Sequence, residues 1–312
     1  MKRALPAILA LLAMLNPAAA GETLYAGDYL SLGFGARPLA LGGAYGALAT
    51  DAAAAAYNPA GLARAGNYGG LFLHSSRFDG LVTYDALSGF YGAAPDLGAF
   101  GAAWVRSAVD EIKLTRWDDD GRPEVYDVVD TAADAFILTY ARALTDGLAV
   151  GVNLKYLRDD LGAATADGFG FDLGVLWCPL EGLGLGLTAH DPYTFKEWSN
   201  GTTDTFDPRL RLGAAYGIDI AEIDSVVTLT GDAELILADY GSSAQVDLDG
   251  AGLDLHAGLE FAVAGVFAAR AGVDRGKLTL GGGVGLWGIN LDYCWLSHEL
   301  GDTHRVSLQA LF

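Results

Sequence analysis

The sequence predicts an all-β protein, a transmembrane antiparallel β-barrel of about 14 strands with an amino-terminal segment folded against or inside it. Apolar residues make up 52% of the 312 residues, yet beyond residue 20 no apolar run approaches the roughly 20 residues of a membrane helix. From Tyr68 onward, apolar residues alternate with small or polar ones. The 43 glycines, 14 tyrosines and 13 phenylalanines suit strands better than helices.

The first 20 residues have the pattern of a secretory signal peptide. Lys2 and Arg3 precede an apolar run at residues 4–15, and Ala18, Ala19 and Ala20 form a small-residue cleavage site. We therefore expect export by the Sec route with cleavage near Ala20. Loss of the two basic residues changes the formal charge from -20 to -22. Such acidity argues against nucleic-acid binding, which needs a basic surface.

Residues 21–67 are predicted to form a plug segment that precedes a barrel at residues 68–312. Asp51 is expected to cap a short helix over Ala52–Tyr57, and Pro59 to end it. The Gly- and Ala-rich composition of residues 33–64 indicates close backbone packing or special dihedral angles. The glycines concerned include Gly33, Gly35, Gly42 and Gly43.

The strands are expected to place apolar residues toward lipid and small or polar residues toward the lumen. Leu148, Val150, Val152 and Leu154, for example, alternate with small or polar residues. The predicted strands are 69–77, 80–91, 97–108, 131–144, 147–158, 168–178, 182–190, 208–218, 225–237, 251–263, 265–273, 277–287, 288–297 and 303–312.

The connections between these strands sort by length. Long ones, such as 109–130, 159–167 and 191–207, fall on one side, and tight turns fall on the other. Outer-membrane barrels have long outer loops and short periplasmic turns. Residues 109–130 are expected to form an acidic, solvated loop, with calcium binding at Asp118–Asp120 as the less favoured alternative.

No pattern predicts an enzyme, a cofactor or a metal site. Residues 283–288 match GxGxxG, but strand-like sequence lies on both sides, where a nucleotide site needs a following helix. Cys178 and Cys294 are expected to be unpaired thiols facing the interior. The last residues alternate and end at Phe312, which resembles the signal read by the barrel-assembly machinery of the outer membrane.

The amino-terminal stretch resembles the PorV/PorQ family of outer-membrane proteins, relatives of the FadL-type channels. The matching residues are Gly33, Phe34, Gly35, Ala36, Arg37, Leu41, Gly42, Gly43, Ala44, Asp51, Tyr57, Asn58, Pro59, Ala60, Gly61 and Leu62. Residues 301–308 also look like that family. In FadL-type channels the Asn-Pro-Ala element belongs to a segment that plugs the barrel. The resemblance therefore implies an outer-membrane protein with a plug.

The resemblance leaves two functions open. In one, the barrel takes up a hydrophobic molecule, the plug shifts, and a lateral gap in the wall releases the ligand. In the other, the barrel is a component or shuttle of a type IX-like secretion system and docks exported proteins by its outer loops. Outer-membrane lipid and the barrel-assembly machinery are expected partners in both.

Overall fold

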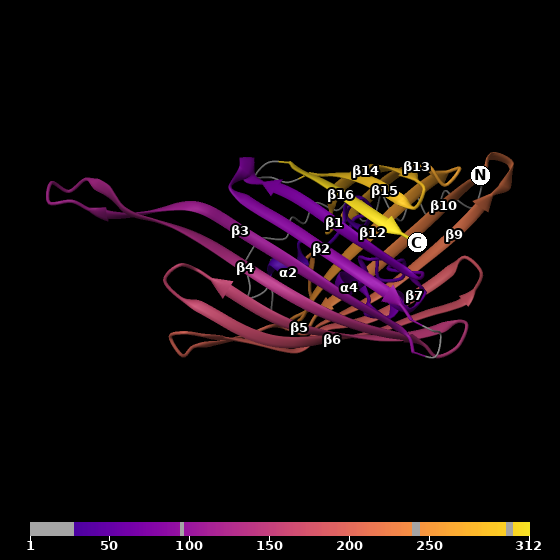
Figure 1. Ribbon diagram of the computed structural model, residues 1–312, viewed down its shortest axis with the longest axis horizontal. Coiled ribbons are helices and arrows are strands. Elements are labelled where there is room, and N and C mark those ends of the chain that lie inside the picture. The colour runs from indigo at the N-terminus through magenta and orange to yellow at the C-terminus, as the bar shows by residue number, and fades with distance from the viewer. Residues whose placement is uncertain (1–27, 94–96, 239–243, 298–301) are drawn as a thin grey trace.

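The computed structural model describes residues 28–93, 97–238, 244–297 and 302–312, and its strands form one barrel (Figure 1). The predicted signal peptide and residues 21–27 of the predicted plug lie outside the described residues. The barrel strands are β1 (Tyr68–Arg77), β2 (Val82–Gly92), β3 (Ala99–Trp117), β4 (Pro123–Ala143), β5 (Leu148–Asp160), β6 (Thr165–Leu180), β7 (Leu183–Trp198), β9 (Arg209–Ile220), β10 (Ser225–Ile236), β12 (Gly252–Val263), β13 (Phe267–Asp274), β14 (Lys277–Leu286), β15 (Ile289–Leu296) and β16 (Thr303–Leu311).

These strands close on themselves. Each pairs antiparallel with its sequence neighbours in the ring, β1 pairs with β16, and β10 pairs with β12 across the short β11 (Val246–Asp247). A second short strand, β8 (Thr203–Thr205), pairs with β7 outside the ring. The predicted 14-stranded antiparallel barrel is therefore confirmed.

The alternation of side chains has the predicted sense. On β5, Leu154 is 60% exposed on the outer face, whereas Asn153 and Lys155 are buried on the inner face. A continuous apolar outer surface is stable in lipid rather than in water, so the wall is built to span a membrane. Other exposed apolar residues of the wall are Phe72, Leu87, Phe100, Leu138, Leu173, Leu212, Leu291 and Leu308.

Aromatic side chains gather at the end of the barrel that has the short connections. Trp287 and Gly288 make the two-residue turn between β14 and β15 there, with φ of 53° and 80°. The GxGxxG match therefore lies in a strand and a hairpin turn. Aromatic girdles mark the membrane interfaces of such barrels. The exposed aromatic residues at this end are Tyr68, Tyr91, Phe100, Tyr140, Trp177, Tyr216, Phe267, Trp287 and Phe312.

The prediction of a loop at residues 109–130 is wrong, because most of these residues form a β-hairpin. β3 and β4 pair as far as Trp117 and Pro123, so only residues 118–122 connect them. β2 pairs with β3 only up to Ala108, and β5 pairs with β4 only from Ala132. Residues 109–131, named here the outer hairpin, therefore project beyond the wall (Figure 1). Charged residues and a shift of register after Val109 conceal the alternation in the sequence.

β7 is also longer than predicted, reaching Trp198 instead of residue 190. The register with β6 shifts between Phe171–Tyr193 and Leu173–Ala189, which leaves a bulge at His190–Pro192. Asp191 has φ of 52° there, and proline cannot donate to the ladder. The bulge interrupts the period-two pattern, so the predicted strand ends too early. The remaining strand limits agree with prediction to within three residues.

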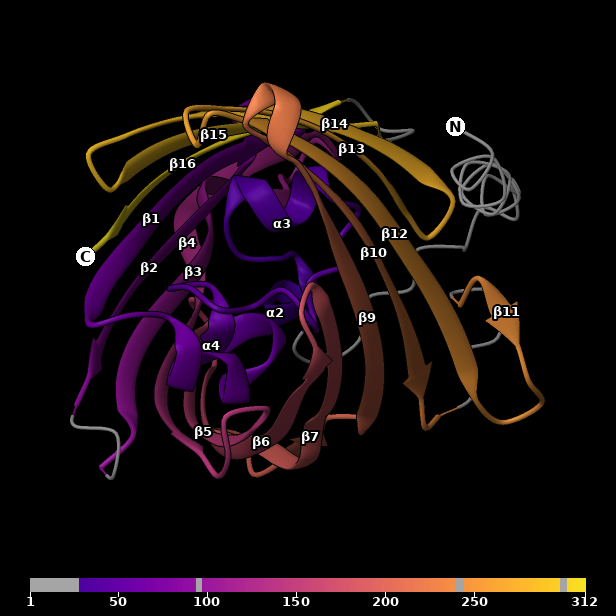
Figure 2. The same cartoon turned by 90° about the vertical axis from the view of Figure 1, so that its right-hand side faces the viewer.

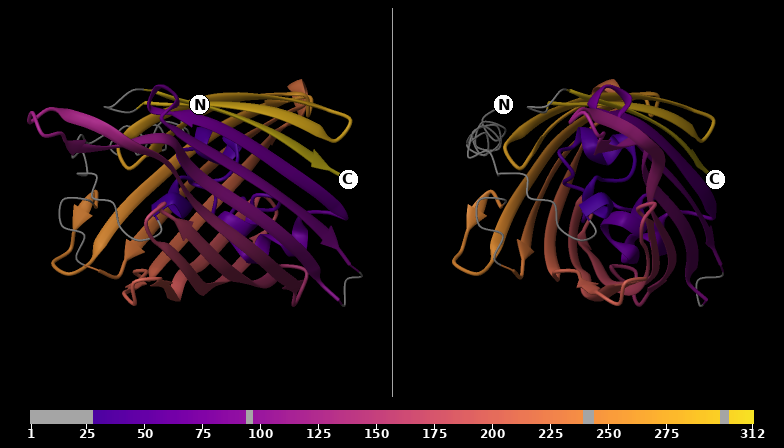
Figure 3. Two further views of the ribbon diagram at one scale, coloured as in Figure 1. Left: turned by 60° about the vertical axis from the view of Figure 1, so that its left-hand side comes forward. Right: turned by 90° about the vertical axis from the view of Figure 1, so that its left-hand side faces the viewer.

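Residues 28–67, named here the luminal segment, lie inside the ring of strands (Figure 2). They contain α2 (Asp28–Ser31), α3 (Ala36–Ala40), α4 (Ala54–Tyr57) and the 3₁₀ helix η1 (Pro59–Arg64). α3 lies against β13 to β16, and η1 lies against β2 to β6. Two further views show the same enclosure (Figure 3). That this segment acts as a plug stays a prediction.

The expected helix over 52–57 begins two residues late, at Ala54. The Asp51 carboxylate accepts a hydrogen bond from the Ala53 amide at 2.9 Å and so organises the turn before the helix. The helix ends at Tyr57, as predicted, because Asn58 before Pro59 is extended, with φ of -160°.

Cys178 and Cys294 are both free thiols, as predicted. Among the described residues, none of the helices is long and apolar enough to cross a membrane.

Candidate functional site

The wall carries glycine where the luminal segment touches it. A Cβ added to Gly258 would lie 2.6 Å from the Leu41 carbonyl oxygen, which is too close for any side chain. The backbone of the segment therefore rests directly on the strands. The same holds, with contacts under 3.0 Å, for Gly151 against Ala60, Gly186 against Gly46 and Gly272 against Gly42, whereas Gly174 and Gly281 lie as close to the side chains of Asn58 and Ala40.

Wall side chains satisfy the backbone of the luminal segment, which has little regular structure of its own. The Asp232 carboxylate accepts hydrogen bonds from the amides of Tyr45 and Gly46 at 3.0 and 2.8 Å. Buried backbone groups need such partners. Other such wall contacts include Ser88 to the Ala52 carbonyl, Asn153 to that of Ala55, Thr188 to that of Tyr57, Thr230 to that of Ala44, Thr279 to that of Ala40, Arg211 to that of Gly43, and the Ala36 amide to Ser307.

The structure joins the predicted residues Arg37 and Asp51 through Tyr45. Arg37 donates to both carboxylate oxygens of Glu260, at 2.9 and 2.8 Å, and to the Tyr45 hydroxyl at 3.1 Å. That hydroxyl donates to Asp51 at 2.6 Å. Burial raises the pKa of Tyr45, so the phenol stays protonated and keeps donating. Glu260 also accepts from Arg270 at 2.5 Å, which ties the network to the wall.

Asn58 fastens the segment at three points. Its Nδ2 donates to the carbonyls of Gly46 and Val175 at 2.9 and 3.0 Å, and its Oδ1 accepts from the Ala60 amide at 3.1 Å. Pro59 opens η1, where a missing amide hydrogen costs nothing. Gly61 packs against the Ala49 carbonyl, where a Cβ would not fit.

The remaining predicted glycines have the special dihedral angles expected of them. Gly33, Gly35, Gly42 and Gly43 have φ of 86°, 88°, 67° and 76°, a region that favours glycine. A Cβ on Gly33 would also lie 3.1 Å from the Tyr57 hydroxyl. These positions shape the path of the luminal segment.

A cavity of about 60 Å³ lies beside the segment, on the side toward the long connections. Along β7, Gly186 and Thr188 contact the luminal segment, and His190 further along lines the cavity. Along β10, Asp232 contacts the segment and Glu234 lines the cavity. The cavity is lined by Leu30, Ser31, Gly33, Phe34, Ala55, Ala56, Tyr57, Tyr84, Val105, Ile137, Lys155, Asp172, His190, Asp191, Arg209, Arg211 and Glu234.

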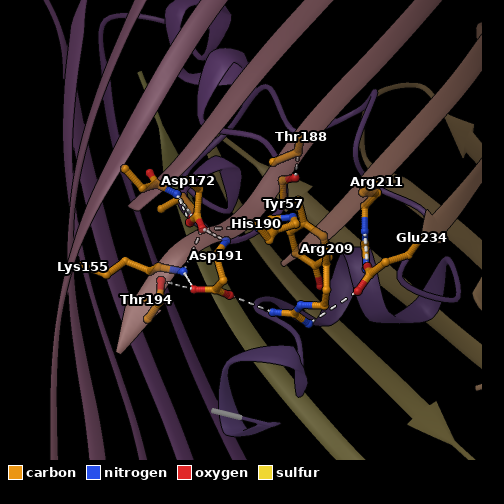
Figure 4. Close-up of polar contacts among 12 residues, drawn as sticks. Tyr57, Lys155, Asp172, Thr188, His190, Asp191, Thr194, Arg209, Arg211 and Glu234 are labelled. Atoms are coloured by element: carbon orange, nitrogen blue, oxygen red, sulfur yellow. Dashed lines mark hydrogen bonds and ion pairs between the residues drawn. The ribbon is translucent and has the colours of Figure 1, made fainter. Parts of the chain in front are cut away.

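One side of the cavity carries charged side chains that form ion pairs with one another (Figure 4). Lys155 contacts Asp172 at 2.7 Å and also contacts Asp191. Arg209 bridges Asp191 at 3.2 Å and Glu234 at 3.4 Å. Buried charges persist in proteins when they are paired in this way. The lining also contains apolar residues, among them Leu30, Phe34, Val105 and Ile137, and Ile137 pairs across strands with Lys155.

The sequence analysis singled out none of these charged wall residues. Their positions in the alternation of each strand could have revealed them. Lys155, Arg209 and Arg211 fall at inward positions of predicted strands, and Asp172 and Glu234 fall at inward positions of neighbouring strands. A lysine or arginine facing a lumen needs a carboxylate opposite, which a search across adjacent strands would have found.

At the tip of the outer hairpin, Asp118 accepts hydrogen bonds from the amides of Asp120 and Arg122, at 3.0 and 2.7 Å, and so closes a turn. Within the described ranges, no group of three or more His, Cys, Asp or Glu residues is placed to hold a metal ion. At the other end, the Phe312 amide donates to the Tyr68 carbonyl at 2.9 Å, and the two rings lie 5.4 Å apart. Phe312 thus helps to join β16 to β1, and its role in assembly stays a prediction.

No protein-family model matches the chain, and a search of curated proteins finds no match. Solved structures do resemble it. The Pseudomonas putida toluene transporter TodX superposes with a TM-score of 0.54 at 15% identity, over 89% of this chain and 96% of that one. The CymD monoaromatic hydrocarbon channel superposes with a TM-score of 0.52 at 10% identity, over 90% of this chain and 98% of that one. At such low identity the likeness concerns the fold alone: the chain has the barrel fold of FadL-like hydrocarbon channels.

Proposed function

We propose that the protein is an outer-membrane channel that takes up a small hydrophobic molecule through a plugged barrel. The observation that carries this proposal is the luminal segment, which is fastened to strands around the ring and lies directly beneath a cavity whose lining is partly apolar. The apolar outer surface and the similar fold of channels named for toluene and monoaromatic hydrocarbons support it. No catalytic step is needed.

The size of the cavity implies that the luminal segment moves. A cavity of about 150 Å³ is known to admit benzene. The present cavity, at about 60 Å³, is too small for an aromatic ring. Its strand walls are held by β-ladders, which the β7 bulge at His190–Pro192 interrupts, whereas Leu30, Phe34 and Ala55–Tyr57 belong to the luminal segment. A ligand therefore enters by displacing segment residues, because local opening is easiest where regular pairing is lacking.

Deletion of residues 33–62 tests the plug. Uptake of labelled toluene by Gram-negative cells and single-channel conductance in planar bilayers would be measured with the intact and the shortened protein. We expect a closed or nearly closed intact channel and a large, steady conductance after deletion. Equal conductance of the two proteins would count against a plug.

Location and biogenesis complete the proposal. The chain would reach the outer membrane by the Sec route, with cleavage near Ala20, and would be inserted by the barrel-assembly machinery through Phe312. The long connections would then face outward, and the aromatic girdle at Trp287 would lie at the periplasmic interface.

One observation favours the secretion-system function as a second candidate. The outer hairpin projects beyond the wall and exposes Trp117 (75%), Tyr126 (53%) and Val128 (52%), an apolar surface suited to a protein partner. Removal of residues 112–129 separates the two candidates. A docking protein would lose secretion of its exported partners, whereas a channel would keep its toluene uptake.

A further inference from the structure

On the charged side of the cavity, the three cationic side chains are already paired with carboxylates, so none is left to pair with an anionic ligand. Each of its three cations contacts at least one carboxylate: Lys155 contacts Asp172 and Asp191, and Arg209 contacts Asp191 and Glu234. Arg211 donates to Glu234 at 2.6 Å and lies 3.7 Å from Asp232. These contacts set three cations against four carboxylates.

That balance makes a carboxylate ligand unfavourable. Its charge would be added to a buried cluster that already holds more carboxylates than cations, and burial of an uncompensated charge is costly. A fatty or aromatic acid could bind only by breaking an existing pair, which would strand another carboxylate. The cluster therefore selects against anions while offering a polar surface.

His190 is a polar group that this surface leaves available. It lines the cavity and is 8% exposed. Its Nδ1 lies 3.9 Å from the Asp172 carboxylate, beyond hydrogen-bonding distance. Throughout the described part of the chain, no group makes a hydrogen bond to this ring. The β7 bulge at His190–Pro192 places it there.

We infer that the cavity, once displacement of luminal-segment residues has widened it, binds an uncharged aromatic molecule bearing one hydroxyl group, with His190 hydrogen-bonded to that hydroxyl. This inference rests on the proposed channel function and narrows its substrate class. A neutral imidazole can both donate and accept, so it matches a phenolic hydroxyl. The ring of the ligand would lie toward the apolar wall residues Val105 and Ile137.

Three probes with the same methylbenzene body test the inference: toluene, p-cresol and p-toluate. Their binding to the intact protein in detergent micelles would be measured by equilibrium dialysis against protein-free micelles. We expect p-cresol to bind about three- to tenfold more tightly than toluene, as one neutral hydrogen bond allows, and p-toluate to bind most weakly.

Variants assign the preference to His190. His190→Leu should abolish the preference for p-cresol over toluene, and His190→Gln, which keeps a donor and an acceptor, should retain part of the preference. His74→Leu is the matched control, because the His74 side chain is 57% exposed on β1. Toluene binding without any p-cresol preference, or with a preference that survives His190→Leu, overturns this inference but leaves the channel function standing. Failure of all three probes to bind overturns both.

Discussion

Arg37 of the luminal segment and Glu260 of β12 form a two-pronged ion pair, with nitrogen–oxygen distances of 2.9 and 2.8 Å. The pair links residues 223 positions apart, and both of its hydrogen bonds join charged groups, which makes them stronger than neutral ones. Arg270 shares the Glu260 carboxylate, so this one acidic side chain holds two arginines.

Removal of Arg37 should loosen the luminal segment. We expect Arg37→Gln to lower the free energy of unfolding by about 1.5–3 kcal/mol, the range for hydrogen bonds to charged groups. Glu260→Ala should cost more, because it leaves both Arg37 and Arg270 without this carboxylate. Urea titration in detergent micelles measures both. Arg116→Gln is the control: its pair with Glu124 spans 3.5 Å on exposed side chains and should contribute under about 1 kcal/mol. A loss for Arg37→Gln no larger than that of the control contradicts the role of this pair.

Wall glycines that the segment touches should be intolerant of side chains. Gly186→Ala places a methyl group against the Gly46 carbonyl and should cost about 1–3 kcal/mol, as overpacking does. It should also raise the conductance by pushing the segment off the wall. Gly217→Ala is the matched control on β9, where the nearest atom to the new Cβ lies 3.9 Å away. Similar stability and conductance of the two variants would be the opposing result.

The stability of the protein should depend on which groups the side chain at position 58 carries, and not only on whether the Asn58 side chain is removed. Asn58→Ala removes three hydrogen bonds from a fully buried position, at about 1–3 kcal/mol for each group left unsatisfied. Asn58→Asp should be more damaging, because a carboxylate oxygen then faces the Gly46 and Val175 carbonyls. Thermal unfolding followed by circular dichroism ranks the variants. An aspartate variant as stable as the wild type would exclude the assigned donor role.

Tyr57 should make the protein sensitive to alkali. Burial raises the pKa of Tyr57 to about 12, and its hydroxyl accepts a hydrogen bond from the Phe34 amide. Between pH 10 and 12 the unfolded chain releases this proton and the folded chain keeps it. Stability therefore falls as pH rises, by about 1.4 kcal/mol per pH unit. Below pH 10 the group contributes no slope.

The measurement for Tyr57 is a urea titration at several pH values from 9 to 12. Tyr57→Phe should show a shallower alkaline decline than the wild type. Tyr126→Phe, at an exposed position of the outer hairpin, should keep the wild-type decline. Identical slopes for Tyr57→Phe and wild type would show that this phenol ionises equally well in the folded protein.

The barrel itself was predictable from the sequence, because period-two alternation reports directly which face of a strand meets lipid. All the barrel strands lie where Leu154, Phe171 and their equivalents alternate with small or polar residues. The predictions failed where local chemistry disturbed the pattern. The bulge at Asp191 and Pro192 interrupts the alternation, so the predicted strand ended before β7 does. The acidic residues around Asp118 led to the prediction of a loop where the structure has the outer hairpin.

The candidate site was predictable only in part. Gly33, Gly35, Arg37 and Asn58 stood out because their types and spacing are unusual for a strand. The charged side of the cavity did not, since Lys155 and Glu234 are ordinary residues until the register of the strands brings their neighbours together. Pairing across strands depends on their register, which the pattern of a single strand does not encode.

The central claim is that the luminal segment must leave the wall for a molecule to pass. A disulfide between positions 47 of the segment and 184 of β7, now Ala47 and Gly184, would tie the segment to the wall. The Cβ of Ala47 lies 3.8 Å from a Cβ built on Gly184, within the range of about 3.5–4.5 Å found in disulfides. Ala47 directly follows Gly46, which Asn58 fastens beneath the cavity.

The disulfide would be introduced as Ala47→Cys with Gly184→Cys in a protein whose Cys178 and Cys294 are replaced by alanine. Toluene uptake by the oxidised and the reduced forms of this one protein would then be compared, with each single-cysteine variant as a control for the oxidant. The account predicts that oxidation stops uptake and that dithiothreitol restores it. Uptake at the same rate by a fully oxidised protein would contradict it.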